Sequence, residues 1–271
     1  MTWTARSLSI GNSAAPYLES GPPGSPDVIV LLHAFPLGMR MWEAQTIPGA
    51  WRAIAPAFPG FDGAAPASTE SSRLDDYAAS VSALLDGLRI ERAVIGGVSR
   101  GGYVTLALWR LAPARFRALF IADSRAGADA PEARANRDGM IELVRSKGAA
   151  AVVEQMLPKL VGDTTRSRRP DVVAAVRRLA ESQTVEGIAA AVARLRDRPD
   201  ASGQLGDMRV PALVVVGDED TLTPPAESER MARAMPSATL ETIPGAGHLA
   251  SLEDPPAFDA VLARFLSRLR S

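Results

Sequence analysis

Residues 94–102 read Val-Ile-Gly-Gly-Val-Ser-Arg-Gly-Gly, and this stretch decides the fold of the 271-residue chain. One serine, Ser99, stands among four glycines directly after an apolar run. The residues that follow, 103–111, are apolar almost all round, as in a helix buried on every side. We therefore expect Ser99 on a sharp turn between a buried strand and a buried helix. Glycines at 97 and 101 fit such a turn, because side chains two residues either side of the serine would collide there.

A strand–serine–helix turn of the form Gly-x-Ser-x-Gly is the usual carrier of a serine nucleophile. The turn strains the backbone of the serine, lifts its hydroxyl above the sheet and points the unpaired N–H groups of the helix at the reacting atoms. The five-residue pattern alone also occurs in ordinary loops. Its position between a buried strand and a buried helix favours Ser99 as a nucleophile over Ser99 as part of a structural loop.

A serine needs a positioned base, and the chain has only two histidines. His248 lies in a glycine-bearing loop between the last apolar run and the last helical pattern, and we expect it to be the base. His33 directly follows the apolar run 28–32. We expect a structural role for His33, with its ring hydrogen-bonded to loop backbone, and keep a catalytic role as the alternative.

The base in turn needs an orienting carboxylate, and three acids follow the apolar run 212–216. Asp220 is the expected orienter, because it completes the chain order Ser, Asp, His of this arrangement. Asp218 is the alternative, although hydrogen bonds to turn amides are its expected role. Asp123, after the run 118–122, is a third candidate, with capping of the next helix as its expected role.

Two backbone N–H groups are expected to hold the developing oxyanion, those of Arg100 and Phe35. Both residues are also candidate substrate contacts. For the side chain of Arg100 two possibilities stay open. The guanidinium either points away and pairs with a carboxylate of the helical insertion, or it contacts an anionic group of the substrate.

Strand-like and helical patterns alternate along the chain, which predicts an α/β fold with a mostly parallel sheet covered by helices on both faces. The apolar runs lie at 28–32, 52–56, 93–98, 118–122, 212–216 and 239–243, and the clearest amphipathic stripes lie at 74–88 and 258–269. Residues 7–10 and 16–19 look like a more polar opening hairpin. Residues 124–209 carry only helical patterns. We expect them to form an all-helical cap on a core of residues 1–123 and 210–271.

With these motifs the chain resembles the α/β-hydrolase superfamily, and within it the capped esterase, enol-lactonase and cofactor-free perhydrolase branch. The matching pieces are His-Ala-Phe-Pro at 33–36, Phe-Pro-Gly-Phe at 58–61, Gly-Val-Ser-Arg-Gly at 97–101, Gly217-x-x-Asp220 and Gly247-His248. Two positions depart from the family pattern. Ala34 stands where glycine is usual, and Arg100 stands where methionine, glutamine or leucine is common. The resemblance implies the α/β-hydrolase fold, a Ser99–His248–Asp220 triad, and neither metal nor organic cofactor.

Bulk composition excludes several classes of function. The net charge is −1, so charge provides no reason to expect nucleic acid or an anionic membrane as a partner. There is no cysteine, which excludes thiolate metal sites and a cysteine nucleophile. No signal-peptide core and no run of ~20 apolar residues is found, so the expected location is the cytoplasm. A monomer or a small homo-oligomer is expected.

The sequence therefore predicts a serine hydrolase that cleaves carboxylic esters with small to medium acyl groups. Three alternatives stay open. The substrate could be a lactone, such as an enol-lactone. The acyl group could pass to peroxide or an alcohol, as in perhydrolases and acyltransferases. The fold could instead serve a receptor that binds a small ligand without turnover.

Overall fold

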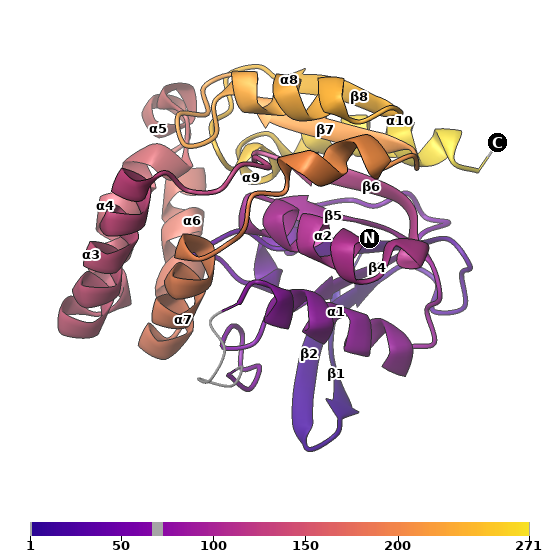
Figure 1. Ribbon diagram of the computed structural model, residues 1–271, viewed down its shortest axis with the longest axis horizontal. Helices are drawn as coiled ribbons and strands as arrows, with labels where there is room; N and C mark the ends of the chain where they lie inside the picture. Colours follow the sequence, from indigo (N-terminus) through magenta and orange to yellow (C-terminus); the bar gives the residue numbers. More distant parts are fainter. Residues whose placement is uncertain (1, 67–72, 271) are drawn as a thin grey trace.

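The computed structural model describes residues 2–66 and 73–270, and its centre is a single eight-stranded sheet (Figure 1). The strand order is β1-β2-β4-β3-β5-β6-β7-β8. β1 and β2 form an antiparallel hairpin, β2 pairs antiparallel with β4, and all remaining pairs are parallel. The strands are β1 Thr4–Ile10, β2 Ser13–Ser20, β3 Val28–Leu32, β4 Arg52–Pro56, β5 Ala93–Val98, β6 Phe116–Ala122, β7 Ala212–Gly217 and β8 Ala238–Ile243.

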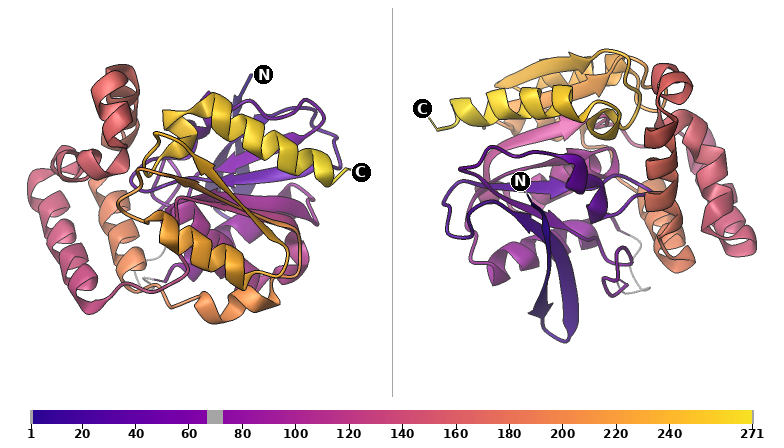
Figure 2. Two further views of the ribbon diagram at one scale, coloured as in Figure 1. Left: turned by 90° about the horizontal axis from the view of Figure 1, so that it is seen from above. Right: turned by 180° about the vertical axis from the view of Figure 1, so that it is seen from behind.

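Helices cover both faces of the sheet, so the predicted α/β architecture is confirmed (Figures 1 and 2). One face carries α1 (Asp75–Gly87), α2 (Arg100–Leu111) and α8 (Pro225–Ala234). The opposite face carries α10 (Pro255–Arg268) and the short 3-10 helix η1 (Met39–Ala44). Two further short helices, α9 (Ala250–Glu253) and η2 (Pro113–Arg115), lie in connections.

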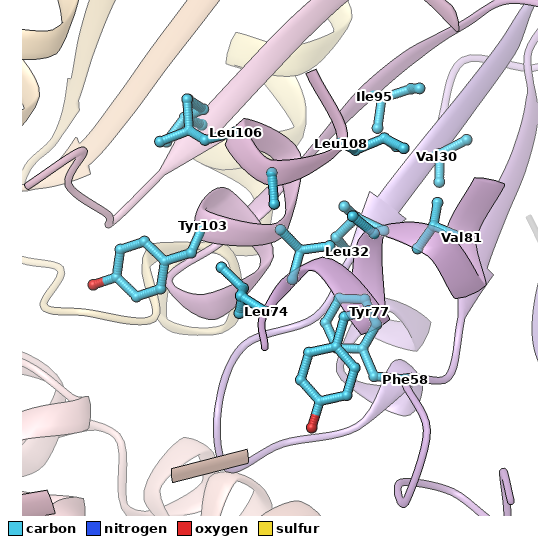
Figure 3. Packing of buried hydrophobic residues seen from close by; sticks show 14 of the residues in the cluster. Val30, Leu32, Phe58, Leu74, Tyr77, Val81, Ile95, Tyr103, Leu106 and Leu108 are labelled. Carbon is cyan, nitrogen blue, oxygen red and sulfur yellow. The ribbon is translucent and has the colours of Figure 1, made fainter. Parts of the chain in front are cut away.

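The core beneath α1 and α2 holds the strand that carries Ser99 (Figure 3). Leu32 of β3 and Ile95 of β5 are fully buried there, against Val81 of α1 and Leu108 of α2. β5 is buried along its whole length, because helices cover the sheet on both sides of it. The edge at which β5 ends is therefore held by rigid packing from above and below.

A run of helices without any strand separates β6 from β7. It consists of α3 (Pro131–Lys147), α4 (Ala149–Leu160), α5 (Asp163–Arg168), α6 (Pro170–Glu181), α7 (Val185–Arg196) and the 3-10 helix η3 (Ser202–Asp207). Helices α3 to α7 stand together at one side of the sheet (Figures 1 and 2). We call residues 124–209 the helical insertion. The insertion leaves the carboxyl end of β6, and the chain then returns to the start of β7, the neighbouring parallel strand.

Candidate active site

Ser99 lies on the turn between β5 and α2, with φ 54° and ψ −112°. A positive φ is costly for a residue with a Cβ, so the surrounding packing must hold this conformation. The neighbouring glycines show how tight that packing is. A Cβ added to Gly97 would lie 2.3 Å from the carbonyl oxygen of Leu32, and one added to Gly101 would lie 2.1 Å from the same atom. Glycine at both positions is therefore required by contact with strand β3 as well as by the turn itself.

Ser99, His248 and Asp220 meet at the carboxyl ends of the parallel strands. The Oγ of Ser99 lies 2.7 Å from Nε2 of His248. The Nδ1 of His248 lies 2.9 Å from Oδ2 of Asp220. All three side chains are buried. The ring can thus accept the serine proton at Nε2 while its Nδ1–H donates to the carboxylate.

Asp220 is held by its own loop. Its Oδ1 accepts hydrogen bonds from the N–H groups of Leu222 and Thr223, at 2.8 and 3.0 Å. Its Oδ2 accepts one from the hydroxyl of Thr223 at 2.7 Å. Burial by itself would raise the pKa of Asp220, but His248 and these donors outweigh it and hold the pKa below its ordinary value. The carboxylate is therefore ionised and fixed in orientation.

A second buried carboxylate, Glu253, holds the loop that carries His248. Its Oε1 accepts the N–H groups on both sides of the histidine, from Gly247 at 2.9 Å and Leu249 at 3.1 Å. Its Oε2 accepts the N–H of Gly162 in the helical insertion at 2.8 Å. Glu253 was not predicted from the sequence. Only its spacing of five residues from His248 could have drawn attention to it.

Asp123 has neither of the roles considered from the sequence. Its side chain is fully buried, its Oδ1 accepts the N–H of Gly217 at 2.9 Å, and its Oδ2 accepts the N–H of Ala250 at 3.1 Å. It neither caps α3 nor bonds to His248, because its φ of 46° turns it back toward β7. Burial, together with the charge of Asp220, raises the pKa of Asp123 well above its ordinary value. Asp218 bonds to a loop amide as expected, accepting from the N–H of Gly245 at 2.6 Å.

His33 lies beneath the loop that follows β3. Its Nε2 accepts the N–H of Phe58 at 3.1 Å, and its Nδ1 lies 3.2 Å from the carbonyl oxygen of Ala34. Burial, and then the charge of Arg100, lower its pKa well below the ordinary value, so the ring is neutral. Its Nδ1 also lies 2.8 Å from a guanidinium nitrogen of Arg100. These contacts are those of a structural residue bonded to loop backbone.

The side chain of Arg100 is fully buried and does not line the cavity above Ser99. It donates to the carbonyl oxygens of Ala34 and Leu37, both at 3.3 Å. Its guanidinium carbon lies 4.0 Å from the ring centroid of Phe61 and 5.0 Å from that of Phe58. Burial lowers its pKa to about 10, which leaves it protonated at neutral pH.

The first possibility is right that the side chain points away from the cavity, but both possibilities are wrong about its partner. The guanidinium of Arg100 forms no ion pair with any carboxylate of the insertion, all of whose residues are described. It also lies outside the space that a substrate would occupy. The turn at Ser99 directs the side chain under the loop of residues 33–38, where aromatic rings and carbonyl oxygens surround the charge.

Neither of the two expected oxyanion donors has its N–H in a hydrogen bond within the described part of the chain. The N–H of Arg100 belongs to the first turn of α2, where no intrahelical acceptor exists. The N–H of Phe35 has no acceptor among the hydrogen bonds of the described residues. The ring of Phe35 lines the cavity, which agrees with its expected contact with a substrate.

A cavity of about 800 Å³ opens above Ser99 and His248. Its floor includes Phe35 and Tyr103, and the ring of Tyr103 points away from the buried cluster under α2 (Figure 3). The helical insertion supplies the facing wall. Met140 and Met156 line it with apolar surface. Four charged side chains that the sequence analysis did not consider also line it, namely Arg125, Asp129, Arg137 and Lys159.

Across residues 2–66 and 73–270 we find no cluster of three or more histidine, aspartate or glutamate side chains that could hold a metal ion. In the same part of the chain, no helix is long and apolar enough to cross a membrane.

Comparisons with known proteins agree with this geometry. The family described as alpha/beta hydrolase fold matches residues 27–255. The chain is 30% identical over 240 residues to a pimeloyl-[acyl-carrier protein] methyl ester esterase of Aromatoleum aromaticum, covering 84% of this chain and 93% of the relative. It is 29% identical over 200 residues to 3-oxoadipate enol-lactonase 2 of Acinetobacter baylyi, covering 71% and 72%. The solved structure of a thermophilic esterase from Thermogutta terrifontis, with malate bound, matches at a TM-score of 0.92 and 30% identity, covering 99% of this chain and all of that one.

Proposed function

The chain belongs to the alpha/beta-hydrolase family, and from this membership we propose that it is a serine hydrolase that cleaves carboxylic esters through an acyl-enzyme. One observation carries the proposal. Two hydrogen bonds link Ser99, His248 and Asp220 in series at the floor of a cavity large enough for a small substrate. A buried hydroxyl, imidazole and carboxylate in this order form the activated nucleophile of acyl transfer.

In the proposed reaction the Oγ of Ser99 attacks the acyl carbon while Nε2 of His248 takes its proton. Asp220 holds the ring and stabilises the imidazolium that forms. The N–H groups of Phe35 and Arg100 carry the oxyanion, a contribution of ~3 kcal/mol per donor in other hydrolases. His248 then protonates the leaving alcohol. In the second half it takes a proton from water, whose oxygen attacks the acyl carbon and releases Ser99.

The helical insertion, residues 124–209, is proposed to be the cap of the active site, on a core of residues 1–123 and 210–271. Its side chains form one wall of the cavity, so the insertion limits what reaches Ser99. The volume of about 800 Å³ lies within the range of small-molecule sites, which supports small to medium acyl groups over long lipids.

A lactone is the second candidate substrate, supported by the similarity to an enol-lactonase. The same residues would open the ring, and the leaving alkoxide would stay attached to the acyl-enzyme until water released the hydroxy acid. Turnover of p-nitrophenyl acetate set beside that of simple lactones separates the two classes. A ligand receptor without turnover would hydrolyse neither.

The proposal is tested by Ser99→Ala. We expect covalent labelling by a fluorophosphonate to disappear and kcat for p-nitrophenyl acetate to fall by about 10⁴-fold or more. Ser228→Ala is the matched control, because Ser228 is a fully buried serine on α8 that does not line the cavity. Labelling or turnover that persists in Ser99→Ala would remove Ser99 as the nucleophile.

A further inference from the structure

We propose that the cavity contains an anion-binding subsite formed by Arg125 and Arg137, so that the preferred substrates are esters carrying a carboxylate away from the scissile bond. This inference rests on the proposed function, since it names the substrate class of the same site. It starts from the charges that line the cavity. Three of them are cationic, on Arg125, Arg137 and Lys159, and one is anionic, on Asp129.

Asp129 organises the two arginines. Its side chain is completely buried, and it contacts three guanidinium groups. Arg125 pairs with Oδ1, Arg137 lies 3.2 Å from Oδ2, and Arg198 lies 2.9 Å from Oδ1. Burial alone would raise the pKa of Asp129, but the three cations, led by Arg198, hold it below the ordinary value. The carboxylate is therefore ionised and fixes the geometry of all three arginines.

Arg198 supplies the counter-charge from behind the cavity wall. Its side chain is 2% exposed, and it does not line the cavity. It stacks on the ring of Tyr103 at 4.2 Å and donates to the carbonyl oxygens of Leu195 and Gly127. Since this one buried cation balances Asp129, the charges of Arg125 and Arg137 are held in place without being neutralised.

Glu227 also lies close enough to Arg125 to act on its charge, but its carboxylate is ion-paired with Arg230. The side chains of Arg125 and Arg137 are 26% and 20% exposed, in a recess rather than on an open surface. A guanidinium that is partly desolvated and already oriented binds a carboxylate more strongly than a mobile surface arginine does.

The same cavity also offers apolar surface. Met140, Leu143 and Tyr103 line the same space as Ser99 and the two arginines. A substrate with a scissile ester, a short apolar chain and a carboxylate at its far end has one group for each of these surfaces. The contact with an anionic substrate group, which the sequence left open for Arg100, is thus assigned to residues of the helical insertion.

The test uses two esters that differ only at the far end of the acyl chain. Mono-p-nitrophenyl adipate ends in a carboxylate, and p-nitrophenyl hexanoate ends in a methyl group. We expect the wild-type protein to favour the adipate ester in kcat/KM, mainly through a lower KM. We expect Arg137→Gln and Arg125→Gln each to lower the adipate-to-hexanoate ratio by about tenfold or more, the effect of one charge-assisted hydrogen bond. Arg137→Lys should keep part of the preference.

Arg134→Gln is the matched control. Arg134 lies on the same helix and is more than half exposed, pairs with Asp197, and does not line the cavity. Its loss removes the same charge and should leave the ratio unchanged. A wild-type protein that hydrolyses both esters without preference, or a ratio that Arg137→Gln leaves unaltered, overturns the subsite and leaves the proposed function standing.

If neither ester is hydrolysed, the proposed function fails, and the subsite is tested by binding alone. Calorimetric titration of Ser99→Ala with adipate should show binding that the Ser99→Ala/Arg137→Gln protein lacks. Equal binding by both proteins, or by neither, overturns the subsite as well.

Discussion

Arg100 directly follows the proposed nucleophile, yet its backbone N–H and its guanidinium lie in different parts of the site. Its N–H belongs to the first turn of α2, while its guanidinium lies beneath the loop of residues 33–38. The two carbonyl groups that it holds, those of Ala34 and Leu37, flank Phe35, the second candidate oxyanion donor. We infer that the buried cation positions this loop against Ser99.

Arg100→Met is therefore expected to lower kcat by about tenfold, since loss of hydrogen bonds from a charged group is worth about 1.5 kcal/mol or more. The factor should be the same for neutral and anionic esters, because the side chain does not line the cavity. Steady-state kinetics with the hexanoate and adipate esters measures both factors. A rise in KM confined to the adipate ester would contradict this placement.

At the residue scale, chemical logic from the sequence succeeded where roles depend on residue type and chain order. Ser99, His248 and Asp220 were selected in that way, and the structure brings them within hydrogen-bond distance. The orientation of Arg100 could not be predicted, because it depends on the backbone dihedrals of the turn. The partners of Asp123 could not be predicted either, because they are backbone N–H groups of residues about 94 and 127 positions further along the chain.

At the element scale, the loop that carries His248 is held by backbone hydrogen bonds to side chains rather than by a helix or a strand. Glu253 accepts three buried N–H groups, two beside the histidine and one at Gly162. Glu219 accepts the N–H of Thr164 at 2.8 Å and also bonds to its hydroxyl. Residues 162–164 of the helical insertion are thereby hydrogen-bonded to the loop that carries Asp220 and to the loop that carries His248.

Glu253→Ala should lower both stability and turnover. Three buried N–H groups lose their acceptor, which we expect to cost about 3 kcal/mol in the free energy of unfolding and about 6–10 °C in Tm. Displacement of the His248 ring should lower kcat by about 100-fold. Thermal melts and kinetics well below the Tm of the variant measure these effects.

Glu253→Gln keeps one acceptor oxygen and should fall between Glu253→Ala and the wild-type protein in both measurements. A loss of Tm in Glu253→Ala with kcat intact would show that Glu253 stabilises the fold without positioning the histidine.

The more deeply a strand or helix is buried, the more clearly the sequence predicted it. The fully buried strands appear as apolar runs, and β3, β5 and β7 lie within one residue of the expected bounds. Helix α8 was not predicted, because only Ser228 and Met231 of its ten residues are buried and it therefore has no apolar stripe. α5 and α9 are too short to show a helical period.

At the scale of the whole molecule, the charged cluster in the cavity wall joins one short stretch of the chain to a distant arginine. The subsite around Asp129 combines Arg125, Arg137 and Arg198, which come from a loop, from α3 and from the segment after α7. Their spacings have no common period, so no local pattern could have predicted the cluster. The net charge of −1 likewise conceals a positively charged cavity.

Two kinds of carboxyl group set how stability depends on pH: folding raises the pKa of some and lowers the pKa of others. Burial raises the pKa of Asp259 to about 6, and that of Asp123 well above its ordinary value. A raised carboxyl pKa means that the folded state binds more protons, so stability falls as pH rises from about 4 to 6. The pKa values of Asp129 and Asp220 are lowered. Their contribution is complete above the ordinary aspartate pKa and is lost as pH falls below it.

The wild-type protein should therefore have a higher Tm at pH 5 than at pH 7.5, and the Tm should drop steeply below pH 4. Asp259→Asn tests the cause, because it keeps an acceptor for the N–H of Thr46 but cannot ionise. Asp259 is partly exposed, so after allowance for solvent screening we expect a gain of only about 1 kcal/mol at pH 7.5, or about 2–4 °C in Tm. At pH 4 the variant and the wild-type protein should melt together. A wild-type Tm that is highest at pH 7.5, or a variant that gains as much at pH 4 as at pH 7.5, would show that these buried carboxyls do not control the stability of the fold.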